Sequence, residues 1–195
     1  MLKIENLSFA YDREHMIFTG FDLELKKSET VAVMGPSGCG KSTLLGLVSG
    51  FLTPTDGRIT CNAQRISYAF QEPRLFPWLT VEENLKAVLP KEAPASQITE
   101  MLAFMDLGGT ETLYPDELSG GMKSRVSLAR ALLYGGDLFL LDEPFSALDR
   151  ELCTSLSQKL RRHLDSIGAS AIFVTHRRED AEILASRIIE ISPVS

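Results

Sequence analysis

The feature that most constrains this chain is a glycine-rich loop set between an apolar run and a helical run. The loop reads GPSGCGKST over residues 35–43, fits the pattern G-x-x-x-x-G-K-[ST], and follows the apolar residues VAVM at 31–34. After it, KSTLLGLV places leucine and valine side chains at helical spacing. A strand, a glycine-rich turn and a helix in this order predict a phosphate-binding loop.

The residue types in this loop each suit a part of a nucleotide. Glycines let successive backbone N–H groups point inward, and the start of the helix adds partial positive charge. Lys41 brings a positive charge to the β- and γ-phosphates, the Ser42 hydroxyl is placed to bind Mg²⁺, and Thr43 should reach the α-phosphate. Cys39 is either a small loop residue or a thiol whose thiolate the helix end favours. The predicted ATP-binding residues are Gly35, Pro36, Ser37, Gly38, Cys39, Gly40, Lys41, Ser42 and Thr43.

Two acids complement the loop. The segment DLFLLDEP at 137–144 predicts a buried strand that ends in Asp142 and Glu143, at the strand end where α/β sheets bind ligands. Asp142 would hold the Mg²⁺ shell, and Glu143 would reach a water in line with the γ-phosphate. Adjacent acids at a strand end also occur as helix caps. A phosphate loop in the same chain favours the catalytic interpretation.

Hydrophobic patterning predicts the remaining architecture. Strand-like runs occupy 3–11, 16–25 and 65–70, with TPTDGR at 53–58 as a turn signal before the third. Residues 71–136 are mainly amphipathic helical stretches, and one of them has Met122, Val126, Ala129 and Leu133 on one face. The second half of the chain alternates strands with helices, which indicates an α/β fold with a parallel sheet covered on both faces. We expect helices at 81–89, 96–107, 122–134, 150–164 and 177–188, and strands at 169–176 and 188–192.

Composition excludes several classes of protein. The chain of 195 residues is 44% hydrophobic and carries a formal net charge of −6, which argues against non-specific nucleic-acid binding. Its longest uncharged stretch, between Lys41 and Asp56, is too short to span a bilayer, and the N-terminus lacks the apolar core of a signal peptide. Three widely spaced cysteines show neither a disulfide framework nor zinc spacing, so a reducing cytosol is expected. Membrane association would come through a partner.

Further motifs follow the loop in a fixed order. LSGGM at 118–122 stands between Gln71 and the strand at 138–141, and SALD at 146–149 follows Glu143. On these motifs the chain resembles, nearly end to end, the nucleotide-binding subunit of ATP-binding cassette (ABC) transporters. The resemblance implies a Walker A loop at 35–43, a Q-loop at Gln71, a signature at 118–122, Walker B at 138–142, a D-loop at 146–149 and a switch histidine at His176.

The resemblance also implies roles for single residues. Tyr11 would stack on adenine, although a tyrosine at a strand edge can equally be a core aromatic, with Phe9 or Phe18 taking its place. Gln71 would contact Mg²⁺ and the attacking water. His176 would contact the γ-phosphate, and the alternative is a satisfied structural histidine at the end of an apolar strand. The implied catalytic residues are Glu143, His176, Gln71 and Lys41, and the implied metal-binding residues are Ser42, Gln71 and Asp142.

In this family the signature serves a second subunit. Ser119 would cap a helix whose start, with the Gly120 and Gly121 amides, faces the γ-phosphate bound to the partner. Asp149 would lie near the partner's Walker A loop. Two chains, identical or not, would then close head to tail around two Mg-ATP. Met122 replaces the usual glutamine, and losing that hydrogen bond should weaken closure by about 0.5–1.5 kcal/mol.

The resemblance further implies an N-terminal antiparallel β subdomain and a signature-bearing helical subdomain on a P-loop NTPase (RecA-like) core with a mainly parallel sheet. We expect one domain over 1–195, with the ATP-binding core at 1–70 and 137–195 and the helical subdomain at 71–136. Two further departures from the family pattern are Arg177, where an acid is common, and a short segment before the Q-loop. No regulatory domain is expected after IIEISPVS.

A cassette without its own membrane helices points to an importer subunit on the inner face of the cell membrane, working with separate permease chains and a solute-binding protein. The run EPRLFPWLTVEENL after Gln71 is similar to cassettes of the nitrate, sulfonate and taurine type. Phe76, Pro77 and Trp78 would meet a permease helix, or Trp78 would pack the helical segment. Two other functions stay open: a regulatory cassette that dimerises on ATP without transport, favoured by Met122, and a P-loop kinase, which leaves LSGG unexplained.

Overall fold

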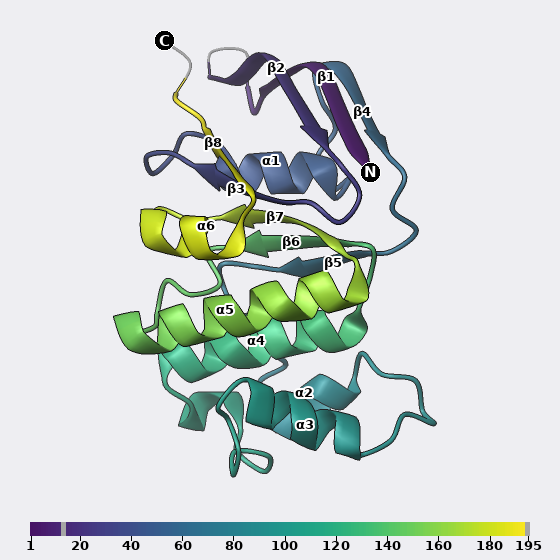
Figure 1. Ribbon diagram of the computed structural model, residues 1–195, viewed down its shortest axis with the longest axis vertical. Helices are drawn as coiled ribbons and strands as arrows, with labels where there is room; N and C mark the ends of the chain where they lie inside the picture. The colour runs from purple at the N-terminus through teal and green to yellow at the C-terminus, as the bar shows by residue number, and fades with distance from the viewer. Residues whose placement is uncertain (13–14, 194–195) are drawn as a thin grey trace.

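The structure is a computed structural model that describes residues 1–12 and 15–193. Strands and helices alternate through most of it (Figure 1). The strands are β1 (Leu2–Ala10), β2 (Met16–Leu25), β3 (Thr30–Met34), β4 (Asp56–Cys61), β5 (Ile66–Ala69), β6 (Leu138–Asp142), β7 (Ser170–Val174) and β8 (Arg187–Glu190). The helices are α1 (Lys41–Val48), α2 (Val81–Lys86), α3 (Ser96–Phe104), the 3₁₀ helix η1 (Pro115–Glu117), α4 (Gly120–Tyr134), α5 (Arg150–Ile167) and α6 (Arg178–Leu184).

The strands form two sheets. Five strands in the order β5-β6-β7-β3-β8 make a parallel sheet, and β2-β1-β4 make an antiparallel sheet. Strands β6 and β7 are buried along their whole length, as expected of parallel strands covered on both faces. The predicted α/β class, with an N-terminal antiparallel sheet beside a parallel sheet, is confirmed.

Alternating side chains divide the parallel sheet into two faces. Leu138 and Leu140 of β6 pack into a core with α1 and the antiparallel sheet, whereas Phe139 and Leu141 pack into a second core with α4, α5 and α6. Figure 1 shows the same division, with α1 on one side of the sheet and α4 and α5 on the other. Helices α1 and α4 therefore start on opposite faces of one sheet.

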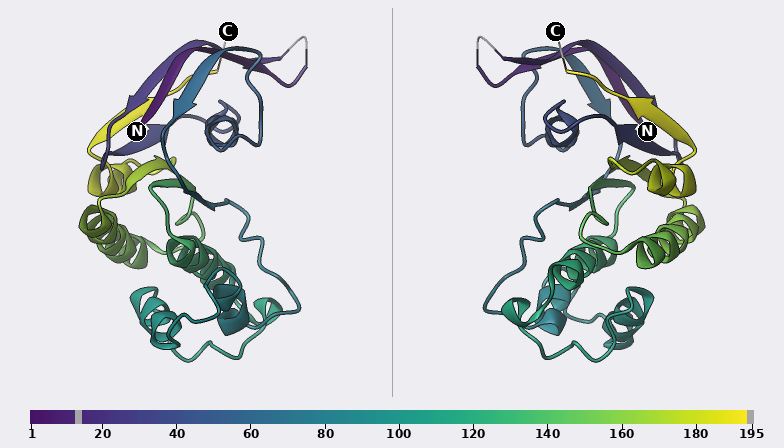
Figure 2. Two further views of the ribbon diagram at one scale, coloured as in Figure 1. Left: turned by 90° about the vertical axis from the view of Figure 1, so that its right-hand side faces the viewer. Right: turned by 90° about the vertical axis from the view of Figure 1, so that its left-hand side faces the viewer.

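The segment 71–136 supplies α2, α3 and α4. In both views of Figure 2, α2 and α3 lie at the end of the molecule away from the antiparallel sheet. Val126 and Ala129 of α4 are fully buried, and Met122 and Leu133 pack partly buried against the same core, which confirms the predicted helix face. Because this core also contains side chains of the parallel sheet, α4 is part of the sheet's covering layer. The division of the chain at 71 and 136 stays a proposal.

Two local predictions differ from the structure. Residues 53–58 were expected as a turn, yet Asp56–Cys61 forms β4, which pairs with β1 from Leu2↔Cys61 to Ser8↔Asp56. This edge strand is short and mostly exposed, so it lacks a clear hydrophobic alternation. The last helix ends at Leu184, earlier than expected, because the Ser186 N–H donates to the Thr30 carbonyl and the chain continues as β8 beside β3.

The longest helix, α5, is amphipathic. Its buried side chains recur at Cys153, Leu156, Leu160 and Leu164, and charged residues cover its outer face. Within residues 1–12 and 15–193, no helix is long and apolar enough to cross a membrane.

Candidate nucleotide-binding site

The glycine-rich loop connects β3 to α1, and its glycines are required by close packing. Gly40 caps α1 with φ 98°, and a Cβ there would come within 2.4 Å of Ile17 Cγ2 on β2. A Cβ on Gly35 would lie 2.3 Å from the Ile191 carbonyl oxygen. The loop is therefore held between β2 and the segment after β8, with its backbone turned as a phosphate loop requires.

Lys41 is folded back into the loop. The residue is 8% exposed, and Nζ donates to the carbonyl oxygens of Gly35 and Pro36, both at 2.9 Å. Thr43 is also buried, and the neighbouring Ser42 is exposed. A positive charge is thus fixed at the start of α1, where the helix dipole adds to it.

An exposed aromatic ring lies beside this loop. Tyr11 directly follows β1, is 63% exposed, and its hydroxyl lies 3.1 Å from Thr43 Oγ1 in a hydrogen bond. Phe9 and Phe18, the other aromatics considered for this place, are both buried. Tyr11 is therefore a surface residue next to the loop, and its ring meets that of Phe9 edge to face, with the ring centroids 4.9 Å apart.

Cys39 is buried. It is 2% exposed and packs in the core around α1. This is the position of a small loop residue that fills space, and the thiol is not presented to solvent.

The two predicted acids occupy different environments at the end of β6. Asp142 is 4% exposed, and among the described residues its Oδ1 has no hydrogen-bond partner. Burial raises the pKa of this carboxyl group, the Glu143 charge adds to the rise, and hydrogen bonding from Ser42 and the Lys41 charge oppose it. Glu143 has a left-handed backbone (φ 45°), held by its N–H donating to the Val174 carbonyl at 3.0 Å. A strained non-glycine residue of this kind is typical of functional sites.

His176 and Glu143 lie together. Strands β6 and β7 are parallel neighbours with Asp142 opposite Val174, so the residues that follow them reach the same edge of the sheet. His176 Nδ1 lies 3.2 Å from Glu143 Oε2, with the histidine side chain 58% exposed and the glutamate side chain 15% exposed. A satisfied core histidine would be buried, and this one is not.

The residues proposed for Mg²⁺ suit an ion shared with phosphates. Within the part of the chain that the structure describes, no three acid, histidine or cysteine side chains gather as a complete metal site. One buried carboxylate oxygen without a partner (Asp142), one hydroxyl (Ser42) and one exposed amide (Gln71, after β5) fit a cation that takes its other ligands from phosphate and water.

The signature segment forms the predicted helix cap. Ser119 precedes α4, and its Oγ accepts a hydrogen bond from the Met122 N–H at 3.2 Å. A Cβ on Gly121 would lie 3.0 Å from the Ala147 carbonyl oxygen, so the signature turn packs directly on the D-loop segment 146–149. Asp149 ends that segment and caps α5 by accepting from the Leu152 N–H at 3.0 Å.

Sequence reasoning missed one buried acid near this site. Asp180, on α6, is 1% exposed and pairs with Arg177, which had been noted only as a departure from the family pattern. The sequence feature that could have indicated this ion pair is the presence of opposite charges three residues apart at the start of a helix.

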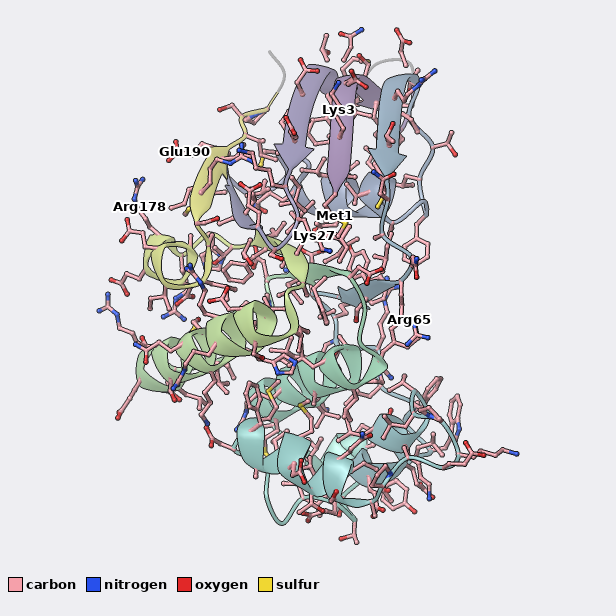
Figure 3. The ribbon with its side chains drawn as sticks, turned by 45° about the vertical axis from the view of Figure 1, so that its right-hand side comes forward. Met1, Lys3, Lys27, Arg65, Arg178 and Glu190 are labelled. Atoms are coloured by element: carbon pink, nitrogen blue, oxygen red, sulfur yellow. The ribbon has the colours of Figure 1, made fainter. Side chains whose placement is uncertain are left out.

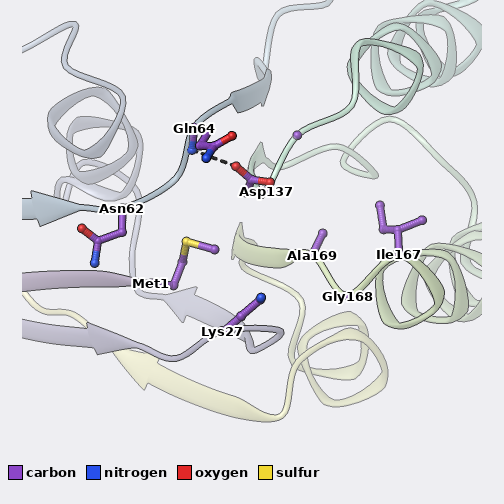
Figure 4. A pocket seen from close by; sticks show the side chains of 9 residues that line it. Met1, Lys27, Asn62, Gln64, Asp137, Ile167, Gly168 and Ala169 are labelled. Carbon is purple, nitrogen blue, oxygen red and sulfur yellow. Dashed lines mark hydrogen bonds between the residues drawn. The ribbon is translucent and has the colours of Figure 1, made fainter.

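A separate pocket of about 480 Å³ lies at the opposite ends of the strands (Figure 4). Asp137, just before β6, accepts a hydrogen bond there from the Gln64 N–H at 2.7 Å. Its lining residues are Met1, Lys27, Asn62, Gln64, Gly136, Asp137, Ile167, Gly168 and Ala169. None of the predicted site residues lines it.

A glycine-rich loop between β3 and α1, a buried lysine in it and acids at the end of β6 define a nucleoside-triphosphate-binding protein of the P-loop class. The model of the ABC transporter family matches residues 18–146. The chain belongs to this ABC transporter family.

Relatives of known name agree with the family. The bicarbonate transport ATP-binding protein CmpC of Synechococcus elongatus is 38% identical over 97% of this chain, which spans 31% of that protein, about a third of its length. The aliphatic sulfonates import ATP-binding protein SsuB of Bacillus cereus is 40% identical over 90% of this chain and 74% of its own length.

Solved structures agree as well. The dimeric structure of MJ0796, a bacterial ABC transporter cassette, matches with a TM-score of 0.91 and 28% identity over 98% of this chain and 94% of that one. The same cassette in a post-hydrolysis state bound to ADP and Pi matches with a TM-score of 0.89.

Proposed function

We propose that this chain is the ATP-hydrolysing subunit of an ABC transporter, closing head to tail with a second subunit around two Mg-ATP and driving solute uptake through a separate permease. One observation carries the proposal of hydrolysis. Glu143 and His176 meet at 3.2 Å at the C-terminal edge of the sheet, directly after the buried Asp142.

Each residue has a task in hydrolysis that its position supports. Tyr11 offers an exposed ring to adenine, and the ammonium of Lys41 is the cation of the loop that meets the phosphates. Glu143 accepts a proton from water as the water oxygen bonds to the γ-phosphorus, and the bond to the β-phosphate oxygen breaks to leave ADP and phosphate. His176 holds Glu143 and contacts the γ-phosphate.

Magnesium belongs to this proposal through its ligands. Asp142 would hold the hydrated ion, and the Ser42 hydroxyl and Gln71 amide would complete the protein's share of the shell. The ion would offset negative charge on the phosphates.

The arrangement of the helices supports the dimer. The signature at the start of α4 and the phosphate loop before α1 belong to helices on opposite faces of one sheet. The capped start of α4, with Gly120 and Gly121, is therefore available to a nucleotide held by another subunit. The related cassette MJ0796 is described as dimeric.

An exposed aromatic pair supports a permease partner. Trp78 is 70% exposed and Phe76 is 40% exposed, and their ring centroids lie 5.7 Å apart. Trp78 therefore does not pack the interior of the helical segment. Aromatic residues of this kind anchor protein interfaces. We place the subunit at the inner face of the cell membrane on this permease, with a solute-binding protein on the other side.

The transported solute is proposed from the run after Gln71 and from the relatives. The two relatives described above are named for bicarbonate and for aliphatic sulfonates, which are both small anions. We propose a small anion of the sulfonate, nitrate or taurine-like class.

ATP turnover and dimer size test the hydrolysis and the dimer together. The parent should hydrolyse ATP slowly, and Glu143→Gln should lower turnover by roughly a hundredfold or more because the general base is lost. The same variant should form a dimer with saturating Mg-ATP, measured by size-exclusion chromatography with light scattering.

Lys41→Ala serves as the control, since it removes the phosphate-binding cation and should neither hydrolyse ATP nor dimerise. A Glu143→Gln protein that stays monomeric with Mg-ATP contradicts head-to-tail closure. A parent that dimerises on ATP without turnover supports the regulatory cassette instead.

A further inference from the structure

The first turn of α6 carries a buried ion pair. Arg177 Nε lies 3.2 Å from Asp180 Oδ2, with the arginine side chain 24% exposed and the aspartate side chain 2% exposed. A buried carboxylate is costly unless it is paired, so the arginine holds this charge in place. The basic residue that departs from the family pattern is thus the partner of a buried acid.

The same carboxylate also binds α5. Cys153 is fully buried on α5, and its Sγ donates to Asp180 Oδ2 at 3.1 Å. Burial, together with the hydrogen bond and the charge of Asp180, raises the pKa of this thiol to about 12. The thiol therefore keeps its proton at neutral pH and remains a hydrogen-bond donor.

A second contact joins the two helix starts at the surface. Arg150 donates through Nε to Glu179 Oε2 at 2.9 Å, and through Nη2 to the other carboxylate oxygen. Both side chains are largely exposed, so this pair alone contributes little. Together with the Cys153–Asp180 hydrogen bond, this ion pair connects the first turn of α6 to the first turn of α5.

His176 lies between the end of β7 and this first turn of α6. Thr175 before it is buried, and the Arg177 N–H after it donates to Thr175 Oγ1 at 3.0 Å. The His176 side chain is mostly exposed, so its position depends on the backbone at both sides. Glu143, His176, Arg177 and Asp180 also border one narrow crevice that has no room for a water molecule.

We propose that Arg177 and Asp180 are positioning residues for His176, which hold its backbone through a buried ion pair fastened to α5 by Cys153. This role rests on the function proposed above: the ion pair decides whether His176 meets Glu143. Because α5 begins directly after Asp149, the same contacts connect the D-loop to the histidine.

Histidine NMR signals test the positioning without needing ATP turnover. The chain has three histidines, so the ring signal of His176 is assigned with His15→Gln and His163→Gln. Arg177→Ala should move the His176 signal and leave the other two in place. Arg178→Ala is the matched control: Arg178 is the next residue, points away from α6 into solvent, and forms exposed ion pairs with Glu182 and Glu190 (Figure 3).

A second variant covers the case in which Arg177→Ala does not fold, because it leaves a buried charge unpaired. The double substitution Arg177→Gln with Asp180→Asn removes both charges, keeps the shape of the aspartate side chain and leaves an uncharged polar group at each position. It should move the His176 signal too. A His176 signal that stays in place in both variants overturns the proposal.

Turnover in two backgrounds separates positioning from general stabilisation. Arg177→Ala should lower kcat roughly tenfold with KM changed by less than about twofold, since geometry and not ATP binding is affected. In a His176→Ala protein the same substitution should cause no further loss. An equal loss of kcat in both backgrounds, or a change in thermal midpoint alone, overturns the role assigned to the pair.

These outcomes are distinct from failure of the proposed function. A parent without ATP turnover contradicts the ATPase, and the NMR result then decides the positioning by itself. If the parent hydrolyses ATP but the His176 signal does not move, the proposed ATPase function stands and the proposed positioning role is wrong.

Discussion

At the scale of single residues, the buried carboxylate of Asp142 lowers the stability of the folded protein but provides the proposed ligand for Mg²⁺. Burial raises its pKa above the ordinary 3.8, so the charged form costs stability in the folded protein. Asp142→Asn should therefore raise the thermal midpoint of the nucleotide-free protein at neutral pH. The gain should shrink as the pH falls through the raised folded-state pKa and vanish below the unfolded value, which a series of melts from neutral to acid pH measures.

Added nucleotide should reverse the order of the two proteins. Mg-ATP should raise the midpoint of the parent strongly and that of Asp142→Asn only weakly, whereas ATP with EDTA should raise both alike. An equal Mg-ATP shift in the two proteins would show that Asp142 holds no part of the metal.

Met122 gives a second prediction at this scale. Met122→Gln restores a polar side chain next to the signature cap, and one neutral hydrogen bond should tighten the ATP-bound dimer roughly two- to tenfold. The dimer constant is measured by sedimentation in the Glu143→Gln background. Met122→Leu keeps the partly buried packing without polarity and should leave the constant at the parental value. If leucine and glutamine behave alike, the prediction of weakened closure is wrong.

At the scale of elements, the start of α4 and the D-loop are packed as one unit. A Cβ on Gly120 meets nothing within 4 Å, but one on Gly121 lies 2.9 Å from Leu148 Cδ2 and 3.0 Å from the Ala147 carbonyl oxygen. Gly120→Ala should stabilise the nucleotide-free protein by about 0.4–1 kcal/mol. Gly121→Ala should be roughly 1 kcal/mol less stable than Gly120→Ala, because the turn must shift. Urea unfolding measures both, and equal stabilities would contradict this contact.

Elements with a strong local pattern were predicted from the sequence, and weakly patterned ones were not. The phosphate loop, α4 with its apolar face and the buried strand β6 each carry their signal within fifteen residues. Strand β4 does not, because its partner β1 lies more than forty residues away and its exposed edge needs no alternation. The early end of α6 also depends on a residue far away in the sequence, because the Ser186 N–H donates a hydrogen bond to the Thr30 carbonyl.

At the scale of the whole molecule, opposite placement of α1 and α4 predicts that a complete site needs two chains. Lys41→Ala and Ser119→Arg should each be nearly inactive alone. Mixed together, they should recover turnover, because one site of the mixed dimer combines an intact phosphate loop with an intact signature. Because neither variant closes on ATP by itself, all turnover should come from mixed dimers, which have one complete site of two, so the rate should not exceed about half of the parental rate.

The control places both substitutions in one chain and mixes it with the Lys41→Ala protein. No dimer in that mixture has an intact pair, so no turnover should return. If the first mixture stays inactive although mixed dimers are seen by mass, the signature serves its own chain and the head-to-tail arrangement is wrong.

The sequence by itself determined the class of this protein. The phosphate loop, the acids after β6 and the order of motifs through LSGGM are contiguous patterns, and local geometry turns them into turns, caps and strand ends. The chemistry of the phosphate loop and the acids could be predicted from residue type and spacing, whereas the role of LSGGM came from the resemblance to the family.

Only the tertiary structure decided which of these groups meet. It placed His176 against Glu143, left Tyr11 exposed beside Thr43, set α4 on the face opposite α1, and paired Arg177 with the buried Asp180 next to Cys153. The physical reason is that most of these contacts join segments far apart along the chain, and burial and charge pairing select them only once the sheet has formed.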